Sequence, residues 1–264
     1  MNQEKKKFKI VTSKRTRYIL PNILTLGGVC LGISSIKFSI DGNFNLAVIF
    51  ILLAAILDAL DGRIARLIKA TSEFGKELDS LTDFVSFGIA PALILYFWTL
   101  NIYGKIGWAI TLIYSVCCVL RLARFNLTKI DEGALWKQNY FEGIPSPIGA
   151  ILILLPLIYE LSGLKNDFNF EYAVPYLTAT VSLLLISKLP TYSFKKISIS
   201  PNLTIFILLA IGISFFSLIF FTFETLLIFG LIYFITIPIA YVTYRKNNKI
   251  FKDSTTEDEH EDVL

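Results

Sequence analysis

Long apolar segments separated by short polar ones constrain the fold of this 264-residue chain more than any other feature. Hydrophobic residues make up 54% of the chain and charged residues only 17%, with a mean hydropathy of +0.62. This balance is far from that of a soluble domain. Each segment is long enough to approach or cross the roughly 30 Å hydrocarbon core of a bilayer. We therefore predict an all-α, polytopic integral membrane protein with about eight transmembrane helices. The apolar segments lie near residues 22–40, 44–62, 84–103, 106–123, 147–163, 172–188, 203–222 and 225–244.

Basic residues are distributed unevenly between the two ends of these segments. If the N-terminus is cytoplasmic, all of the 25 Lys and Arg residues except Lys37, Lys105 and Lys165 fall in cytoplasmic segments. Short cytoplasmic loops are enriched in Lys and Arg. The sequence therefore predicts that both termini are cytoplasmic. We expect the membrane to be a bacterial-type inner or cell membrane. The clustered bases suit anionic lipid headgroups, so we expect membrane lipids, and not nucleic acid, as their partners.

Four aspartates interrupt the apolar pattern in one short block. Asp58 and Asp61 stand three residues apart, and Asp79 and Asp83 stand four apart, so each pair projects from one face of its helix. Converging carboxylates near hydrocarbon need a compensating positive charge, and divalent cations bind such oxygen ligands. We interpret the four aspartates as metal ligands. The alternative, a solvated acidic loop, is disfavoured by the apolar neighbours.

Small and basic residues accompany the aspartates. Gly62 and Ala65 fall on or near the helix face that carries the first two aspartates, and Gly75 lies one turn before the third. Their small size leaves room for a bulky ligand beside the metal. Arg66, like its neighbour Arg63, can contact phosphate oxygens. The block therefore indicates a site for a diphosphate with metal-assisted chemistry.

Histidine and cysteine limit the possible chemistry. The only histidine, His260, lies in the charged tail, so a general base in the apolar part of the chain must be a carboxylate or another non-histidine group. The three cysteines, Cys30, Cys117 and Cys118, lie in predicted spans and form no CxxC motif. We expect them to pack, and to form neither a zinc site nor a disulfide framework.

Three further polar stretches are candidates for a role at the site. Arg121 and Arg124 end the fourth predicted span and could bind a carboxylate or phosphate, although ordinary positive-inside anchoring explains them equally well. The loop 127–146 is either a gate or headgroup contact, or a plain connector. Asn22 and Thr25 lie one turn apart and could face the aspartates. A simple helix start is the favoured interpretation of that pair.

The aspartate block resembles, without a departure, the signature of the CDP-alcohol phosphatidyltransferase family. The matching pattern is Asp58-x2-Asp61-Gly62-x2-Ala65-Arg66-x8-Gly75-x3-Asp79-x3-Asp83. Other stretches resemble the phosphatidylserine synthase branch of this family, and they lie at residues 21–25, 72–81, 121–126 and 141–147. The resemblance covers residues 21–147, so the last four predicted spans rest on hydropathy alone.

The resemblance implies a six-helix catalytic core that opens to the cytoplasm, is commonly a homodimer, and binds two divalent cations, usually Mg²⁺ or Mn²⁺. By motif position, the metal ligands would be Asp58, Asp61 and Asp79, with Asp83 at the second ion and as the candidate base. The residues that would line the CDP site are Gly62, Ala65, Arg66 and Gly75. Our hypothesis for the carboxylate of serine is Arg121 and Arg124, with Asn126 less secure.

The implied reaction transfers the phosphatidyl group from CDP-diacylglycerol to the hydroxyl of L-serine and gives phosphatidylserine and CMP. The metal ions would neutralise the diphosphate while Asp83 accepts the proton of the attacking hydroxyl. One alternative is a family member with another acceptor, such as a phosphatidylglycerophosphate or phosphatidylinositol-type synthase. The other is a divalent-cation transporter, which is disfavoured because the aspartates cluster at the ends of the spans.

We expect four regions along the chain. A basic cytoplasmic or interfacial segment at residues 1–20 precedes the catalytic membrane core at residues 21–190. An additional helical pair at residues 191–247 follows the core. A charged, disordered tail at residues 248–264 ends the chain.

Overall fold

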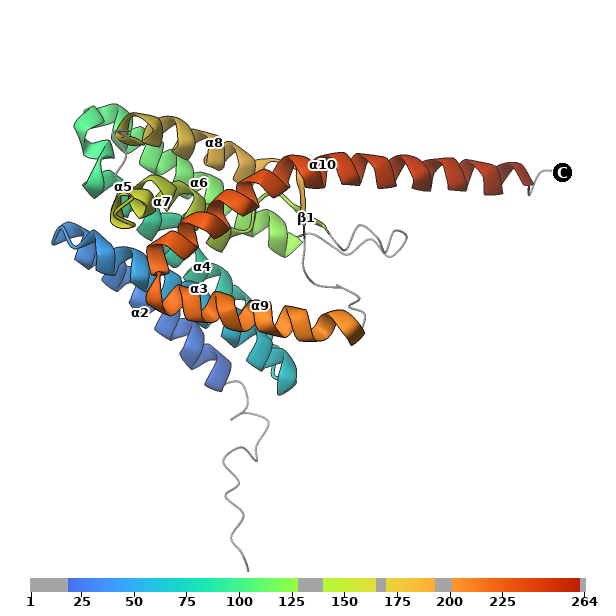
Figure 1. The fold of residues 1–264 in the computed structure, drawn as a ribbon, viewed down its shortest axis with the longest axis horizontal. Helices are drawn as coiled ribbons and strands as arrows, with labels where there is room; N and C mark the ends of the chain where they lie inside the picture. Colours follow the sequence, from blue (N-terminus) through green and yellow to red (C-terminus); the bar gives the residue numbers. More distant parts are fainter. Residues whose placement is uncertain (1–18, 128–139, 165–169, 193–200, 262–264) are drawn as a thin grey trace, which may run out of the picture. The chain divides into compact units, whose positions relative to one another are not determined.

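The computed structural model describes residues 19–127, 140–164, 170–192 and 201–261. These residues are helical apart from short connections and one two-stranded β-pair (Figure 1). The predicted interfacial segment lies outside the described residues except for its last two, as does most of the loop 127–146. The elements are α2 (Ile19–Ile40), α3 (Phe44–Leu67), α4 (Glu73–Asp83), η1 (Phe84–Ile89), α5 (Ala90–Trp98), η2 (Leu100–Tyr103), α6 (Gly104–Leu127), β1 (Tyr140–Glu142), α7 (Ser146–Leu161), η4 (Phe170–Ala173), α8 (Val174–Ile186), β2 (Pro190–Tyr192), α9 (Pro201–Phe220) and α10 (Thr222–Glu261).

Apolar helices dominate the described part of the chain. Five of them are long and apolar enough to cross a membrane, and they comprise residues 19–40, 44–67, 73–98, 100–127 and 222–248. Three shorter apolar helices comprise residues 146–161, 170–186 and 204–220. Together they correspond, in order, to the apolar segments found in the sequence. The prediction of an all-α, polytopic membrane protein is confirmed.

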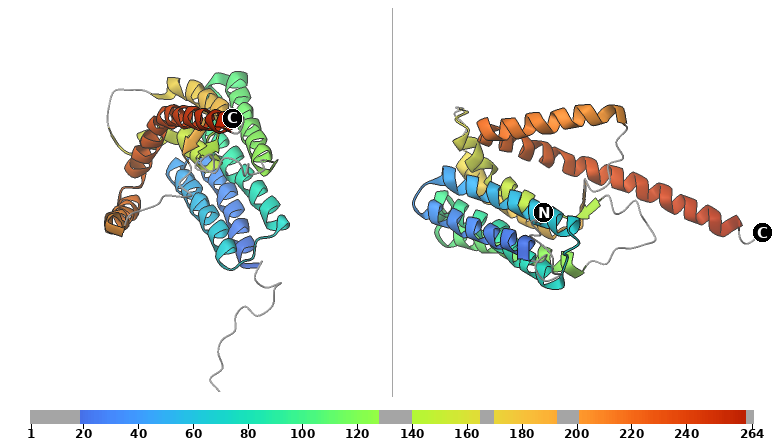
Figure 2. Two further views of the ribbon diagram at one scale, coloured as in Figure 1. Left: turned by 90° about the vertical axis from the view of Figure 1, so that its right-hand side faces the viewer. Right: turned by 90° about the horizontal axis from the view of Figure 1, so that it is seen from below.

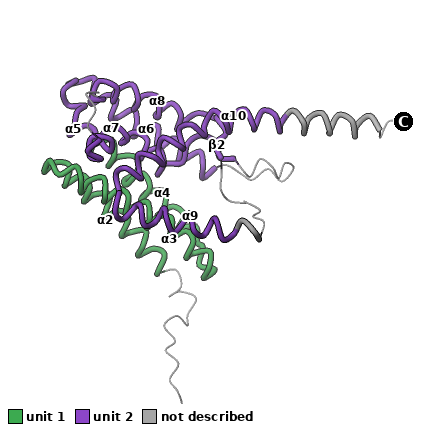
Figure 3. The backbone as a smooth tube through the Cα atoms, in the orientation of Figure 1, with its two compact units in different colours: residues 1–94 green, residues 95–264 purple. Residues whose placement is uncertain are grey.

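The chain forms two compact units, residues 1–94 and residues 95–264 (Figure 3). In the first unit, α2 packs against α3 and α4 (Figure 2). The buried face of α2 consists of small or compact residues, spaced alternately four and three apart, while large apolar residues such as Ile23 and Leu26 stay exposed. This is the pattern expected where membrane helices approach closely and turn their bulky side chains to lipid. The buried positions are Pro21, Thr25, Gly28, Gly32, Ser35 and Ser39.

A π-helical segment, η1, continues directly from α4 after Asp83. The π-helical hydrogen-bond pattern is shown by Ala90, whose backbone N–H donates to the carbonyl of Val85, five residues earlier. Pro91 follows and has no N–H to restore the ordinary α-helical pattern. The apolar pattern predicts that the third span begins near residue 84, but the continuous helix starts at Glu73. Both aspartates of the second pair therefore lie within this helix and not before it.

The second unit is built around α6, α7, α8 and α10. Helix α6 packs on α8, and α10 packs on α7 and β2. The strands β1 and β2 pair in antiparallel register, with Tyr140 opposite Tyr192 and Phe141 opposite Thr191. The fully buried side chains of this core include Tyr114, Leu152, Ile153, Leu154, Leu157 and Ile158.

Helix α10 is the longest element of the second unit and projects beyond the other helices of that unit (Figure 1). It extends to Glu261 and so includes residues 248–261, for which the sequence predicts disorder. The division of the chain into four regions stays a prediction.

Candidate functional site

Three of the four aspartates converge in the first unit. Asp58 and Asp61 lie one turn apart near the C-terminal end of α3, and Asp79 lies on α4. One carboxylate oxygen from each residue lies within 4.8 Å of the other two. Asp61 is only 4% exposed, while the other two are half-buried. Three converging carboxylates in an apolar surrounding fit a hard divalent cation, which takes oxygen ligands and compensates their charge.

Asp83 lies next to this cluster but is not one of the three aspartates whose oxygens lie within 4.8 Å of one another. It ends α4 one turn after Asp79, and its carboxyl group is close enough to that of Asp58 to interact with it. The i, i+4 spacing on α4 is responsible, because it places Asp79 and Asp83 on the same face of the helix. All four predicted ligands are therefore neighbours, with Asp83 at the margin of the set.

Thr25 contacts the cluster, although a simple helix start is the favoured interpretation of its position in the sequence. Its hydroxyl donates a hydrogen bond of 2.6 Å to Oδ2 of Asp61, and it also lies 3.0 Å from the carbonyl of Pro21. The hydroxyl is buried at the α2–α3 contact and so restrains the orientation of the Asp61 carboxylate. In the sequence, this contact is indicated only by two polar residues, Asn22 and Thr25, that lie one turn apart at the start of an apolar helix.

The small residues differ in what surrounds them. A Cβ atom added at Gly62 would meet only the Arg66 guanidinium, at 4.0 Å, so this side of α3 is open. At Gly75 the added atom would lie 3.1 Å from Oγ of Ser72 and 3.4 Å from Oδ1 of Asn22. The N–H of Gly75 donates to that same Ser72 Oγ, which caps α4. The glycines thus keep the start of α4 close to α2 and leave α3 accessible.

Positive charge surrounds this end of the first unit. Arg63 and Arg66 are exposed on the last turns of α3, while Lys69 and Lys76 are exposed in the following turn and at the start of α4. These side chains lie at the helix ends that carry the aspartates. Clustered carboxylates that could hold a cation, next to exposed guanidinium groups, form a surface suited to a phosphate-containing ligand.

The two predicted arginines of α6 have different environments in the second unit. Arg121 is 7% exposed, and its Nη1 donates a hydrogen bond of 2.5 Å to Oγ of Ser146 at the start of α7. Arg124 is half-buried and donates to three backbone carbonyls at the end of α8. Those bonds measure 2.5 Å to Ile186, 3.0 Å to Ser187 and 3.5 Å to Leu185.

Gly143 lies between the segment that Arg121 contacts, at Ser146, and the end of α8 that Arg124 contacts. Its φ is +75°, a conformation that favours glycine. An added Cβ atom would lie 2.8 Å from the carbonyl of Leu185 and 2.9 Å from that of Ser187. The backbone at Gly143 thus packs against the helix end that Arg124 caps. We call the group Arg121, Arg124, Gly143, Ser146 and Thr191 the arginine node.

Comparison with known proteins identifies the family of this chain. Residues 18–186 match the sequence model of the family described as CDP-alcohol phosphatidyltransferase. This match covers more than half of the chain. The chain therefore belongs to the CDP-alcohol phosphatidyltransferase family.

Several relatives are named CDP-diacylglycerol–serine O-phosphatidyltransferase. That of Mycobacterium tuberculosis is 37% identical over 186 residues, which are 70% of this chain and 64% of the relative. That of Helicobacter pylori is 35% identical over 197 residues, 75% of this chain and 81% of the relative. That of Bacillus subtilis is 34% identical over 178 residues, 67% of this chain and 92% of the relative. The match spans less than two thirds of the length of the mycobacterial relative.

Proposed function

We propose that this protein transfers the phosphatidyl group of CDP-diacylglycerol to the hydroxyl of L-serine, and releases phosphatidylserine and CMP. The observation that carries the proposal is the convergence of Asp58, Asp61 and Asp79 within 4.8 Å. Family membership and the names of the relatives support the choice of donor and acceptor. The resemblance of residues 121–147 to the serine-specific branch supports the acceptor further.

The aspartate cluster would hold two divalent cations, which we propose to be Mg²⁺ or Mn²⁺. Asp58, Asp61 and Asp79 would be ligands, with Asp83 at the second ion. When bound, such cations neutralise the diphosphate and the charge that develops on the departing CMP. The open side of α3 at Gly62 and Ala65, with Gly75 opposite α2, would accept the CDP moiety. The Arg66 guanidinium would contact its phosphate oxygens.

Asp83 is our candidate for the general base. As the serine oxygen forms its bond to the phosphorus that carries diacylglycerol, the bond from that phosphorus to the bridging diphosphate oxygen breaks. The hydroxyl proton moves to the Asp83 carboxylate, and CMP leaves with the bridging oxygen. A carboxylate base is consistent with a sequence whose only histidine is His260.

Arg121 is our candidate for binding the carboxylate of serine. Its guanidinium is fixed by Ser146, and a buried guanidinium is well suited to a planar carboxylate. Arg124 uses its donors on the α8 carbonyls, so we assign it a positioning role beside Arg121. This division refines the expectation that both arginines bind serine.

The distribution of basic residues also supports a proposed orientation. We propose that the aspartate cluster and both termini face the cytoplasm, because almost all Lys and Arg residues then lie on that side. We further propose a homodimer, which rests on the resemblance to the family alone.

A parallel acceptor assay tests the proposed function. Purified protein receives CDP-diacylglycerol and Mn²⁺ together with labelled serine, glycerol 3-phosphate or inositol in separate reactions. We expect labelled lipid and CMP with serine only, and loss of turnover in a folded Asp83→Asn protein. Lipid labelling from glycerol 3-phosphate but not from serine would contradict the acceptor. Retained turnover in Asp83→Asn would remove its assignment as the base.

A further inference from the structure

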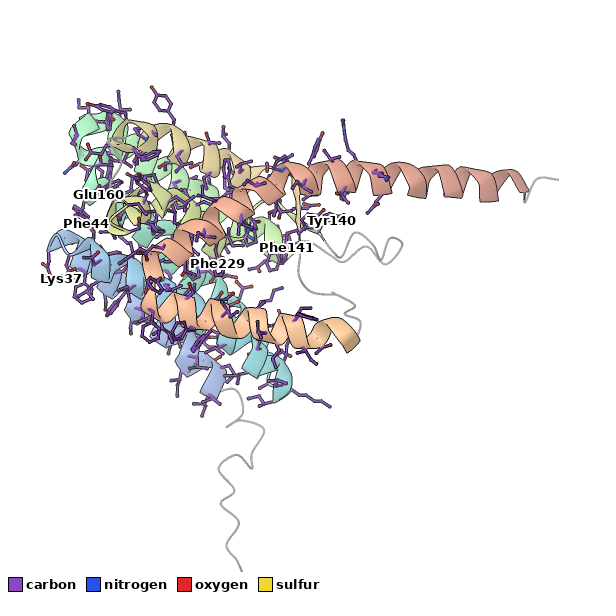
Figure 4. The ribbon with its side chains drawn as sticks, viewed as in Figure 1. Lys37, Phe44, Tyr140, Phe141, Glu160 and Phe229 are labelled. Atoms are coloured by element: carbon purple, nitrogen blue, oxygen red, sulfur yellow. The ribbon has the colours of Figure 1, made fainter. Side chains whose placement is uncertain are left out.

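Helix α10 contacts the β1–β2 pair through three neighbouring side chains. The ring of Tyr244 meets that of Tyr140 edge to face, with centroids 5.2 Å apart. Thr243 Oγ1 accepts a hydrogen bond of 3.1 Å from the hydroxyl of Tyr192, and Asn247 Nδ2 donates one of 3.5 Å to the hydroxyl of Tyr140. Figure 4 labels Tyr140 where β1 runs beside α10. These contacts attach the last helix to both strands.

The same two tyrosines hold the strands together. Tyr140 of β1 and Tyr192 of β2 are directly opposite in the strand register, and their rings stack with centroids 5.6 Å apart. Since α10 contacts each of them, a change at Tyr244 or Thr243 acts on the pair as a whole. The strands are only three residues long, so few backbone bonds hold them in place without α10.

The β-pair leads directly into the arginine node. Thr191 of β2 donates a hydrogen bond of 2.7 Å to the carbonyl of Gly143, and the N–H of Gly143 donates one of 2.8 Å to the carbonyl of Leu189. Ser146, which accepts the bond from Arg121, follows three residues later. The position of Ser146 is therefore tied to the strands, and through the strands to α10.

We propose that α10 positions Arg121 for the acceptor by holding the β1–β2 pair, with Tyr244 and Thr243 as positioning residues. The inference rests on the proposed function, in which Arg121 binds the serine carboxylate. It adds a specific role for a part of the chain outside residues 18–186, the part matched by the family model. Tyr244 and Thr243 act through Ser146 and Arg121 and have no contact with substrate.

The expected effect is selective for serine. Each contact in this path belongs to the second unit, whereas Asp58, Asp61, Asp79 and Asp83 belong to the first. Loosening the β-pair should therefore change the binding of the acceptor and leave the binding of CDP-diacylglycerol close to its original strength. A general loss of folding would instead reduce the amount of active enzyme and change no KM.

The test is the kinetics of three variants of the full-length protein. Tyr244→Leu removes the ring, Tyr244→Phe retains it, and Phe234→Leu makes a matched change at an exposed position of the same helix. We expect Tyr244→Leu to raise the KM for serine roughly five- to tenfold, in line with the loss of one aromatic contact. The kcat and the KM for CDP-diacylglycerol should change less than about twofold. Tyr244→Phe and Phe234→Leu should match the wild type.

A double-mutant cycle separates positioning from any independent effect. If Tyr244 acts through Arg121, Tyr244→Leu should have little further effect on the KM for serine in an Arg121→Lys background. The inference would be overturned if Tyr244→Leu raised the KM for serine by the same factor in the wild-type and Arg121→Lys backgrounds. It would also be overturned if Tyr244→Leu raised the KM for serine and the KM for CDP-diacylglycerol equally. Should Tyr244→Leu fail to fold, Thr243→Val removes the acceptor for Tyr192 with little change in volume and should raise the KM for serine in the same way.

The cycle also separates this inference from the proposed function. An unchanged KM for serine in Arg121→Lys would contradict the assignment of Arg121 itself. If Arg121→Lys raises the KM for serine but Tyr244→Leu and Thr243→Val leave it unchanged, only the role of α10 would be contradicted.

Discussion

The hydroxyl of Thr25 connects the first described helix to the proposed cation site. It donates to Asp61 at 2.6 Å, and Asp61 is the most buried of the clustered aspartates. A hydrogen bond to a ligating carboxylate fixes its orientation before the cation binds. We therefore expect the contact to affect the metal affinity of the proposed site more than the stability of the fold.

Replacing Thr25 with valine tests this role with almost no change in side-chain shape. Outer contacts of this kind typically contribute about 10- to 100-fold to metal affinity, so we expect Thr25→Val to weaken Mn²⁺ binding at least about tenfold. Calorimetric titration of the purified protein with Mn²⁺ measures the change, and Thr25→Ser, which keeps the hydroxyl, is the control. Equal affinities for the wild type and Thr25→Val would show that the bond does not support the metal site.

Arg121 and Arg124 are predicted to respond differently to truncation. Arg121→Ala should raise the KM for serine about 10- to 100-fold, the usual range for a lost hydrogen bond between charged groups. Arg124→Ala removes a cation from the last carbonyls of α8 and should lower the free energy of unfolding by about 1 to 3 kcal/mol. Steady-state kinetics and thermal unfolding in detergent separate the two outcomes. A serine-specific KM effect in Arg124→Ala at unchanged stability would restore the original joint assignment.

At the level of elements, α2 determines how closely the helices of the first unit can approach. Ser86 of η1 donates a hydrogen bond of 3.1 Å to the carbonyl of Gly28, so the backbones of α2 and η1 are in near contact. A Cβ atom added at Gly32 would lie 2.9 Å from the Cα of Ser86. The π-helical segment and the glycines of α2 therefore depend on each other.

Gly32→Ala should force these two elements apart. Overpacking of this kind costs about 1 to 3 kcal/mol, and the intrinsic preference of alanine for helices offsets part of the loss. We expect a lower midpoint of thermal unfolding in detergent for Gly32→Ala. Gly27→Ala is the matched control, because its added atom would meet only the flexible end of Leu57, at 3.3 Å. A midpoint as high in Gly32→Ala as in Gly27→Ala would contradict the close contact.

At the level of the whole molecule, the charge distribution predicts a testable orientation. In a cysteine-free background, a single cysteine at the exposed residue Thr71 should be cytoplasmic, and one at the exposed residue Leu164 should face outward. A membrane-impermeant maleimide should label Leu164→Cys in intact cells and label Thr71→Cys only after permeabilisation. The reverse pattern would contradict the proposed cytoplasmic site.

Much of the site could be predicted because its signals are local. The spacings of Asp58 with Asp61 and of Asp79 with Asp83 follow helical periodicity, and the structure brings these four residues together. The apolar segments likewise predict the helices, because hydrocarbon leaves a backbone few alternatives to helical hydrogen bonding.

Other features depend on which distant segments meet. The bond from Thr25 to Asp61 requires α2 to pair with α3, and the contacts of Arg124 depend on where α8 ends. The two strands of the β-pair are only three residues long, so neither carries a recognisable pattern of its own. They are also far apart in the chain, so their pairing cannot be read from local sequence. The π-helical turn at η1 reflects Pro91 together with close packing on α2, which periodicity does not reveal.

The proposed function makes the aspartate cluster responsible for metal-dependent transfer from CDP-diacylglycerol to serine. The most direct measurement is the formation of labelled phosphatidylserine from labelled serine by the wild type, Asp79→Asn and the exposed control Glu77→Gln, each over a titration of Mn²⁺. We predict Mn²⁺-dependent product from the wild type and Glu77→Gln, and at least about a hundredfold less from folded Asp79→Asn. Equal product formation by Asp79→Asn, or product formed by the wild type in the presence of a chelator, would contradict the claim.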